Sequence, residues 1–423
     1  MKNILRFFKV AKLGLLLVLV LLFTSCNKPL PDAVPISYPS ANSSATTTIY
    51  GLINSDTTYS FFKAAATKVG MLAQLNDSLN SVFTVFLPNN NAFRASGISS
   101  IAVVNALPAQ TLGGIVGYAI IPGRQFLEAD IPASTNTVPN MQLPTSLKIG
   151  TLPGTPIDLK LTAFSSNSAT GFYDNNIPVV KPDLKMKNGV IHLVAAVVVP
   201  PSQVLKDAIY NNSNLSYFKA AIARADSGQT GLNRFDSLLA YPVTNMTVLV
   251  PDNAAFQTLL FGTIYGGLLQ QGLQPAQAVP MATQLSSTPD VFSNPALFSS
   301  IPAAMVRAIL AYHFLATDQG QGFQPNIRVF SNNFSSTPAF YKTLINSDTS
   351  TLAHSHPGIE VQATFTGPFV SGLQFTGLGT FPPGGAPYSG APAKAEIVAQ
   401  NPFYDNIAVN GVYYVIDKVL LPQ

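Results

Sequence analysis

The sequence has 423 residues, with 23 Lys and Arg against 19 Asp and Glu, and a formal net charge of +4 at pH 7. Four of the basic residues and none of the acidic ones fall within residues 1–25, so the rest of the chain carries 19 charges of each sign and is neutral. The apparent basicity of the full sequence is therefore no sign of a nucleic-acid or anionic-lipid partner. A charged fraction of 10%, against about 25% in typical soluble proteins, predicts a surface of small and neutral polar side chains.

The N-terminus has the pattern of a bacterial lipoprotein signal. Four basic residues precede Leu13–Phe23, an uninterrupted apolar run that is shorter than the ~20 residues of a membrane-spanning helix. The run ends in LLFTSC, which resembles a lipobox, and Cys26 is the only cysteine in the chain. We therefore predict that residues 1–25 are a lipoprotein signal peptide and that Cys26 is diacylated. The alternative is an ordinary secretory signal that leaves a free thiol.

Residues 26–47 are predicted to be an extended tether. They are rich in Pro, Ser and Thr and lack any helical or strand period. The folded part of the chain is expected to begin near Thr48.

The remainder of the chain is an imperfect duplication. The stretch TVFLPNNNAF at 84–93 returns as TVLVPDNAAF at 247–256. The closing stretch NGVIHLVAAVVVPP returns at the end of the chain as NGVYYVIDKVLLPQ. We therefore predict one domain at 48–201 and a second at 202–423.

The two copies differ in length. The second copy is longer between these motifs, and we predict insertions near residues 258–300 and 319–393. The first insertion is expected to be helical or irregular, and the second contains a Gly/Pro-rich loop at 367–393 that carries aromatic residues. Long loops in compact domains are usually either functional or disordered.

Local signals predict an α+β fold. The strand-like run FTVFLP ends at Pro88, and Asn89 is placed to cap a helix with Phe93 in its first turns. Asp252 and Phe256 repeat this strand-to-helix corner in the second copy. Helices are expected at 61–69, 110–119, 217–225 and 302–315.

The dipeptide Asn188-Gly189 is expected to form the turn of a β-hairpin near the end of the first copy. Both residues tolerate the positive φ of a type I′ turn. This register would place Met186 opposite Ile191.

These motifs, in this order and in both copies, resemble the fasciclin domain. The strand-and-corner signature of that family is matched twice, its Tyr-His pair is matched at Tyr312-His313, and its closing NGV motif ends each copy. The resemblance implies two tandem fasciclin-like domains of α+β class, each a β-wedge with flanking helices, the second enlarged by insertions. It also implies extracellular adhesion and ligand contact without a cofactor. The first copy departs from the pattern, since it has Tyr118-Ala119 in place of Tyr-His.

The ligand-contact candidates come from the Tyr-His pair and from the aromatic loop of the second insertion. Rigid aromatic rings on a polar backbone suit sugar or protein surfaces at small entropic cost. The alternative is that the phenylalanines cover the core of the enlarged second domain. The candidates are Tyr312, His313, Phe369, Phe375, Phe381 and Tyr388.

Nothing in the sequence favours an enzyme. The four histidines are accompanied by no nucleophile, phosphate-loop or zinc-protease motif. His192 and His313 are expected to be hydrogen-bonded structural residues. The stretch HSH would place His354 and His356 on the same side of an extended segment. Two histidines are fewer ligands than a metal site needs. We predict no catalytic residue, no metal and no cofactor.

Lipobox, tether and tandem domains together predict a membrane-anchored extracytoplasmic adhesion or interaction protein that binds an extracellular protein or glycan. The membrane contact would be made by the N-terminal lipid, and no nucleic-acid partner is expected. Asn27, in place of an aspartate after the cysteine, favours the outer membrane of a Gram-negative bacterium, with the protein facing either the periplasm or the outside. The alternative function is an accessory glycan-capture lipoprotein of an outer-membrane nutrient-uptake system.

Overall fold

The computed structural model describes most of the chain after the predicted tether. The described residues are 44–77, 81–151, 154–320, 322–348, 350–380, 392–398 and 404–422. The predicted signal peptide and Cys26 lie outside them, as does most of the predicted tether. Among the described residues, no helix is long and apolar enough to cross a membrane.

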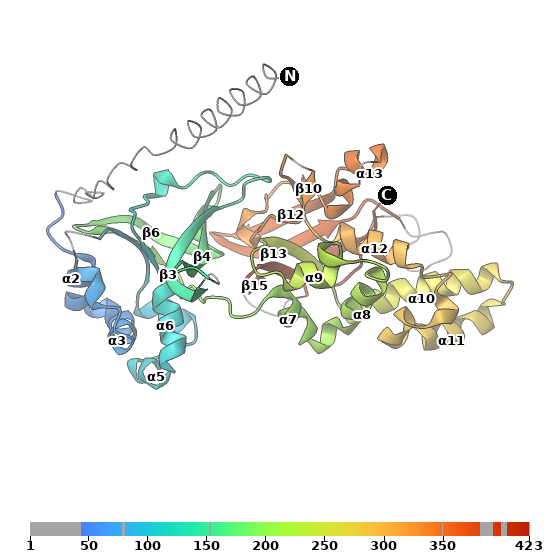
Figure 1. Cartoon of the computed structure of the whole chain (residues 1–423), viewed down its shortest axis with the longest axis horizontal. Coiled ribbons are helices and arrows are strands. Elements are labelled where there is room, and N and C mark those ends of the chain that lie inside the picture. The colour runs from blue at the N-terminus through green and yellow to red at the C-terminus, as the bar shows by residue number, and fades with distance from the viewer. Residues whose placement is uncertain are drawn as a thin grey trace, which may run out of the picture. The chain divides into compact units, whose positions relative to one another are not determined.

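The first domain is a seven-stranded sheet with helices gathered on one side of it (Figure 1). Its helices are α2 (Ile49–Ser55), α3 (Ser60–Lys68), α4 (Asn90–Ala95), α5 (Ile101–Ala106) and α6 (Ala109–Tyr118). Its strands are β1 (Phe83–Pro88), β2 (Ile120–Pro122), β3 (Met141–Thr151), β4 (Asp158–Ser168), β5 (Gly171–Asp174), β6 (Ile177–Met186) and β7 (Gly189–Val194). The strand order in the sheet is β2-β1-β7-β6-β5-β4-β3.

The second domain has more helices and divides its strands among separate sheets. Its helices are α7 (Leu205–Tyr210), α8 (Ser216–Ala225), α9 (Phe235–Ala240), α10 (Asn253–Gln270), α11 (Pro275–Ser286), α12 (Ala303–Tyr312) and α13 (Thr351–Ser355). Its strands are β8 (Met246–Pro251), β9 (Thr317–Asp318), β10 (Phe323–Gln324), β11 (Ala339–Tyr341), β12 (Ile359–Thr366), β13 (Phe369–Thr376), β14 (Lys394–Glu396), β15 (Asn406–Ala408) and β16 (Gly411–Ile416). The sheet orders are β15-β16-β8, β11-β12-β13-β14 and β10-β9.

The two domains share one frame. Strands β1 and β7 pair in parallel with Phe83 opposite Gly189, and β8 and β16 pair in parallel with Met246 opposite Gly411. The predicted helices are confirmed as α3, α6, α8 and α12, and the first insertion is helical, as α10 and α11. Helix α12 ends earlier than predicted because the chain after it joins the strands, where Phe314 bridges to β8.

Strand β1 is buried on both of its faces, which explains its uniformly apolar sequence. Phe83, Val85 and Leu87 pack into the core beneath the helices. Phe86 points the other way, into a second core enclosed by the curled sheet. Alternate residues of one strand therefore join two cores.

A buried asparagine near the end of each copy ties three segments together. Oδ1 of Asn188 accepts the N–H of Ile49, where α2 begins, at 2.9 Å. Its Nδ2 donates to the carbonyls of Leu75 and Asp77, in the segment that leads into β1, at 2.8 and 2.9 Å. Asn410 makes the equivalent bonds in the second domain, at 2.8 to 2.9 Å, to Leu205, Leu239 and Tyr241.

The glycine after each asparagine is required by close backbone packing. A Cβ on Gly189 would lie 1.9 Å from the carbonyl oxygen of Phe83, and one on Gly411 would lie 2.4 Å from that of Met246. No side chain fits at either position, so the parallel strand pair can form only with glycine there.

The predicted type I′ turn at Asn188-Gly189 is wrong by one position. The turn residues are Lys187 and Asn188, and Met186 pairs with Gly189 rather than with Ile191. Asn188 supplies a buried amide and Gly189 allows close strand packing. These tertiary contacts override the turn preference of the dipeptide.

The strand-to-helix corners are confirmed. Oδ1 of Asn89 accepts the N–H of Ala92 at 2.9 Å, and Asp252 caps α10 in the same way. The next residue of each corner is also an asparagine: Asn90 accepts the N–H of Phe61 at 3.0 Å, and Asn253 accepts the N–H of Tyr217 at 3.1 Å. The polar side chains of the corner therefore position α3 and α8.

The described residues from 44 onward belong to one compact unit in which the two domains touch. The guanidinium carbon of Arg328 lies 4.2 Å from the ring centroid of Phe164 on β4, and Phe330 packs 5.9 Å from the same ring. The carbonyl of Arg328 accepts a hydrogen bond from Nδ2 of Asn140 at 2.7 Å. The junction thus combines aromatic packing with a buried, hydrogen-bonded arginine.

We expect Asn410→Ala to lower the free energy of unfolding by at least about 2 kcal/mol, because it leaves one buried N–H and two carbonyls unpaired. Asn91, which is exposed beside the first corner, is the matched control, and Asn91→Ala should change the value by less than about 0.5 kcal/mol. Urea denaturation measures both. Equal midpoints for the two variants would show that the amide does not hold the frame.

Candidate binding groove

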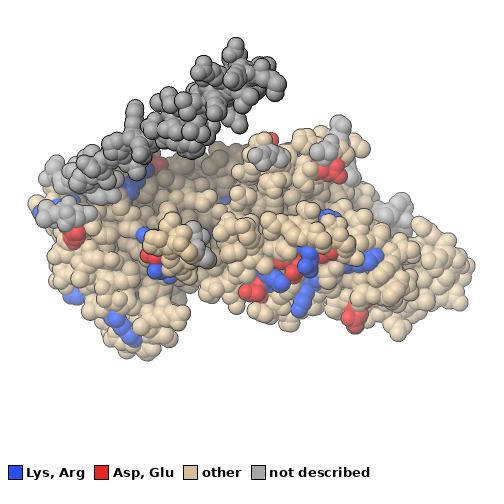
Figure 2. Space-filling model, in the orientation of Figure 1, with Lys and Arg blue, Asp and Glu red and all other residues tan. Residues whose placement is uncertain are grey.

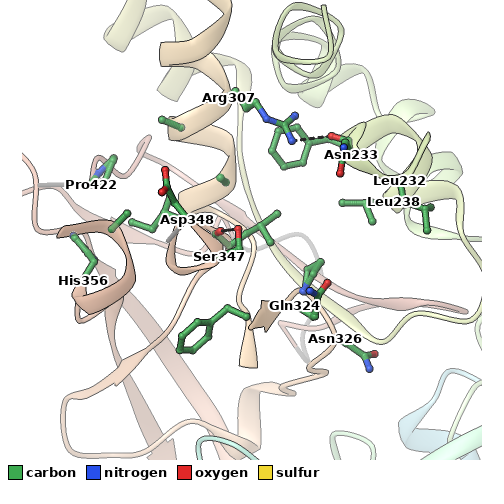
Figure 3. A pocket seen from close by; sticks show the side chains of 18 of the residues that line it. Leu232, Asn233, Leu238, Arg307, Gln324, Asn326, Ser347, Asp348, His356 and Pro422 are labelled. Atoms are coloured by element: carbon green, nitrogen blue, oxygen red, sulfur yellow. Dashed lines mark hydrogen bonds between the residues drawn. The ribbon is translucent and has the colours of Figure 1, made fainter. Parts of the chain in front are cut away.

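A groove of about 1070 Å³ opens on the second domain, and part of its wall is the second insertion (Figure 3). Its floor is a face of α12, where Ala304, Ala308 and Ala311 carry small side chains. One wall is formed by η5 (Gly231–Asn233), α9 and the turn that follows. The other is formed by β10, η9 (Leu344–Ser347) and α13.

In the first domain the equivalent helix face is covered. Helix α6 ends at Tyr118 as α12 ends at Tyr312, and both tyrosines are fully buried. A Cβ on Gly117 would lie 3.3 Å from Cα of Leu147 on β3, and one on Gly114 would lie 3.3 Å from the ring of Pro200. The first domain therefore closes the face that the second domain leaves open.

The wall at η5 and α9 is held by charged side chains that neutralise one another. Oδ1 and Oδ2 of Asp226 accept the N–H groups of Phe235 and Asp236 and so cap α9. Arg307 reaches over from α12, where its guanidinium carbon lies 4.8 Å from the ring centroid of Phe235 and its Nη2 donates to the carbonyl of Asn233 at 2.8 Å. Arg307 Nη1 lies 3.8 Å from Asp226 Oδ1, which offsets its charge.

The opposite wall is held by one buried asparagine. Oδ1 of Asn346 accepts the N–H of Thr343 at 3.0 Å, and Nδ2 donates to the carbonyls of Ala353, His354 and His356. Nζ of Lys342 donates to the carbonyl of His356 at 2.6 Å. Burial and the nearby Lys342 lower the pKa of His356, so its ring is neutral at pH 7.

The groove is nearly uncharged and exposes aliphatic side chains. Leu352 is 87% exposed, Val243 is 69% exposed and Leu232 is 54% exposed. Its ionised lining residues are Arg307, already offset, and Asp348. On the face drawn in Figure 2, charges of both signs gather over the helices of the second domain and most of the remaining surface is uncharged.

Tyr312 and His313, the first predicted ligand contacts, are both fully buried. The hydroxyl of Tyr312 donates to the carbonyl of Gly358 at 2.7 Å, and its ring meets that of His356 edge-on, behind the groove wall. Nδ1 of His313 bonds to the carbonyl of Ile309 at 2.8 Å, and Nε2 accepts the N–H of Leu420 at 3.1 Å. Both side chains therefore lie inside the second domain, and their role as ligand contacts stays a prediction.

The aromatic candidates of the second insertion fall into three groups. Phe375 is fully buried in β13 against Phe334 and Tyr414. This position fits the alternative interpretation, in which the phenylalanines cover the core of the second domain. Phe369 is 46% exposed at the start of the same strand, outside the groove. Phe381 and Tyr388 lie outside the described residues. The predicted loop at 367–393 thus includes a strand, because its Phe369–Thr376 stretch pairs with β12.

The histidines lie in separate hydrogen-bonded settings rather than in one cluster. His354 and His356 belong to α13 and its C-terminal cap, not to the extended segment expected. The ring of His192 is buried and hydrogen-bonded to the carbonyl of Phe126 at 2.9 Å. Among the residues that the structure describes, no cluster of three His, Cys, Asp or Glu side chains could hold a metal ion.

The sequence did not indicate the residues that line the groove. None of the four predicted contacts that the structure describes lies in it, although its second wall comes from the predicted insertion at 319–393. The available signal was the comparison of the copies: the face of the first copy's helix that carries Gly114 and Gly117 carries alanine in the second copy.

We expect His313→Gln to remove a pH-dependent part of the stability. Burial lowers the pKa of His313 to about 4, and protonation would turn Nε2–H toward the N–H of Leu420. The unfolded chain takes up this proton below about pH 6.5, so the stability that the neutral ring provides is present above that pH and lost as the pH falls toward 4. The difference in the free energy of unfolding between the wild type and His313→Gln should shrink by roughly 3 kcal/mol over that range.

Urea denaturation at a series of pH values tests this expectation. His354 is exposed, so His354→Gln is the matched control. An advantage over His313→Gln that stays constant from pH 7 to pH 4 would contradict it.

Comparison with known proteins identifies the first domain. Residues 57–200 match the family model described as the fasciclin domain. A solved FAS1 domain pair from the insect cell adhesion molecule fasciclin I aligns with 14% sequence identity, covering 86% of this chain and 96% of that chain, with a TM-score of 0.32. No curated protein of similar sequence was found. Residues 57–200 are therefore similar to the fasciclin domain, and the described part of residues 202–423 repeats the same α+β frame.

Proposed function

We propose that this protein is a membrane-anchored extracytoplasmic adhesion or interaction protein that binds an extracellular protein or glycan in the groove of its second domain. Fasciclin domains are associated with cell adhesion or interaction. The observation that carries the proposal is the contrast between the two copies. The first domain covers this helix face, whereas the second domain leaves it open and surrounds it with an inserted segment.

The exposed side chains of the groove support a binding role. Leu232, Val243 and Leu352 are aliphatic, yet they remain in contact with solvent around one concave site. Burying apolar surface against a partner is favourable by roughly 25 cal/mol per Å². Concave apolar patches of this kind mark interaction sites more often than exposed single residues do.

The anchor is proposed to be the lipid on Cys26. A diacylated cysteine supplies two chains, which is the number that stable membrane attachment requires. The lipobox-like sequence and Asn27 support the proposal of an outer-membrane location, on either face. The glycan-capture lipoprotein remains the second prediction, and it differs from the first in requiring a glycan ligand.

We expect Cys26→Ser to move the protein from the membrane fraction to the soluble fraction. The substitution removes the thiol to which lipid would be attached and leaves the described domains unchanged. Ser37→Ala, within the predicted tether, is the matched control and should stay with the membranes. Immunoblots of fractionated cells measure the distribution, and membrane retention of Cys26→Ser would refute the lipid anchor.

We expect Leu352→Asp to reduce binding of the full-length protein to arrays of extracellular proteins and glycans by about tenfold or more, because it places a charge in the apolar groove. The exposed Leu159 on β4 of the first domain provides the matched control, Leu159→Asp. If both variants bind as well as the wild type, the ligand is held elsewhere and the groove is not the binding site.

A further inference from the structure

We infer that the groove receives an extended, uncharged and mainly apolar segment of a partner protein. This inference rests on the proposed function, in which the groove is the binding site, and it narrows the partner to a protein. Four properties of the groove carry it: its size, its charge, the kind of apolar group that it exposes, and its side-chain amides.

The size and the charge of the groove limit the ligand. Its volume of about 1070 Å³ slightly exceeds the ~300–1,000 Å³ of small-molecule clefts, so the groove has room for a ligand larger than one sugar ring or one amino acid. Arg307 is already offset by Asp226 and bonded to Asn233, so no free cation is available for an acidic ligand. The remaining ionised residue, Asp348, is exposed at the rim, and its Oδ1 accepts the N–H of Ser350.

The exposed apolar groups favour a protein over a glycan. Sugar rings are bound by flat aromatic faces. Among the exposed apolar side chains that line the groove, one is aromatic, that of Tyr241. The other exposed apolar side chains are the aliphatic Leu232, Val243 and Leu352. Covering these with hydroxyl-rich sugar would desolvate hydroxyl groups without pairing them, which costs free energy. Aliphatic side chains of a protein segment carry no such cost.

Side-chain amides favour an extended segment over a helix. Asn233, Gln319 and Gln324 line the groove and are exposed, and no hydrogen bond joins their side-chain amides to other described residues. Each amide offers both a donor and an acceptor. A helix satisfies its own backbone groups, whereas an extended segment presents unpaired N–H and C=O groups that such amides can pair.

The walls are fixed before a ligand arrives. Asn346 holds the η9–α13 wall through hydrogen bonds to four backbone groups, and Asp226 and Arg307 hold the facing wall. Figure 3 shows Leu232 and Leu238 on one side of the space and Asp348 and His356 on the other. A preformed groove loses less conformational entropy on binding than a mobile one, so short segments can bind measurably.

The test is a selection of random peptides on the full-length protein, in parallel with a glycan array. We expect the enriched peptides to be uncharged, with apolar residues throughout. Val243→Asp should weaken their binding by about tenfold or more, because the new carboxylate faces apolar ligand groups. Val180→Asp is the matched control, since Val180 is 59% exposed on β6 of the first domain, and it should bind as the wild type does. Thermal unfolding of both variants confirms that they fold.

Each other outcome overturns the inference in a distinguishable way. Glycan binding that Val243→Asp abolishes would keep the groove and the proposed function but exclude a protein segment. Enrichment of charged peptides would exclude the uncharged ligand. Peptide binding that is unchanged in both Val243→Asp and Leu352→Asp would remove the groove as the site, while adhesion by another surface of the protein would remain measurable in the array experiment.

Discussion

A single buried amide in each domain, that of Asn188 or Asn410, holds together the parts on which the rest of the fold depends. It joins the start of the first helix, the segment that leads into the central strand, and the strand pair itself. The glycine that follows admits the neighbouring backbone, which any side chain would block. Since an unpaired buried amide group costs about 1–3 kcal/mol, the three bonds lock these segments as a unit. The corner asparagines and their helices are then fixed relative to that unit.

The second domain adds a groove to this frame without disturbing it. Its insertion is attached at contacts that recur in both domains. The Thr247 hydroxyl donates to the carbonyl of Ile327 and accepts the N–H of Val329. Thr84 makes the equivalent bonds in the first domain, to Arg124 and Phe126. The added segments can therefore differ freely between these fixed points, as surface loops on a rigid scaffold commonly do.

The frame was predictable from the sequence because local signals encode it. The strand, its proline and the capping residue act over a few positions, and they recur in both copies. The turn at Asn188-Gly189 was misplaced because its tertiary role, a buried amide and a close strand contact, has no local signature. The groove was missed for a similar reason: alanines on α12 and a few leucines and valines carry no chemical signal. Tyr312, His313 and Phe375 carry such a signal, yet the fold buries all three.

A weakly charged groove determines how such a protein would capture a partner. With charged residues at only 10% of the chain, long-range attraction contributes little, and encounters proceed at the rate of unsteered diffusion. Binding must then rely on short-range burial of apolar groups within prepared walls. The proposed lipid anchor compensates for the missing attraction, because it confines the groove near one surface and raises its effective concentration toward partners there. The uncharged groove and the proposed membrane anchor would then act together in the proposed binding.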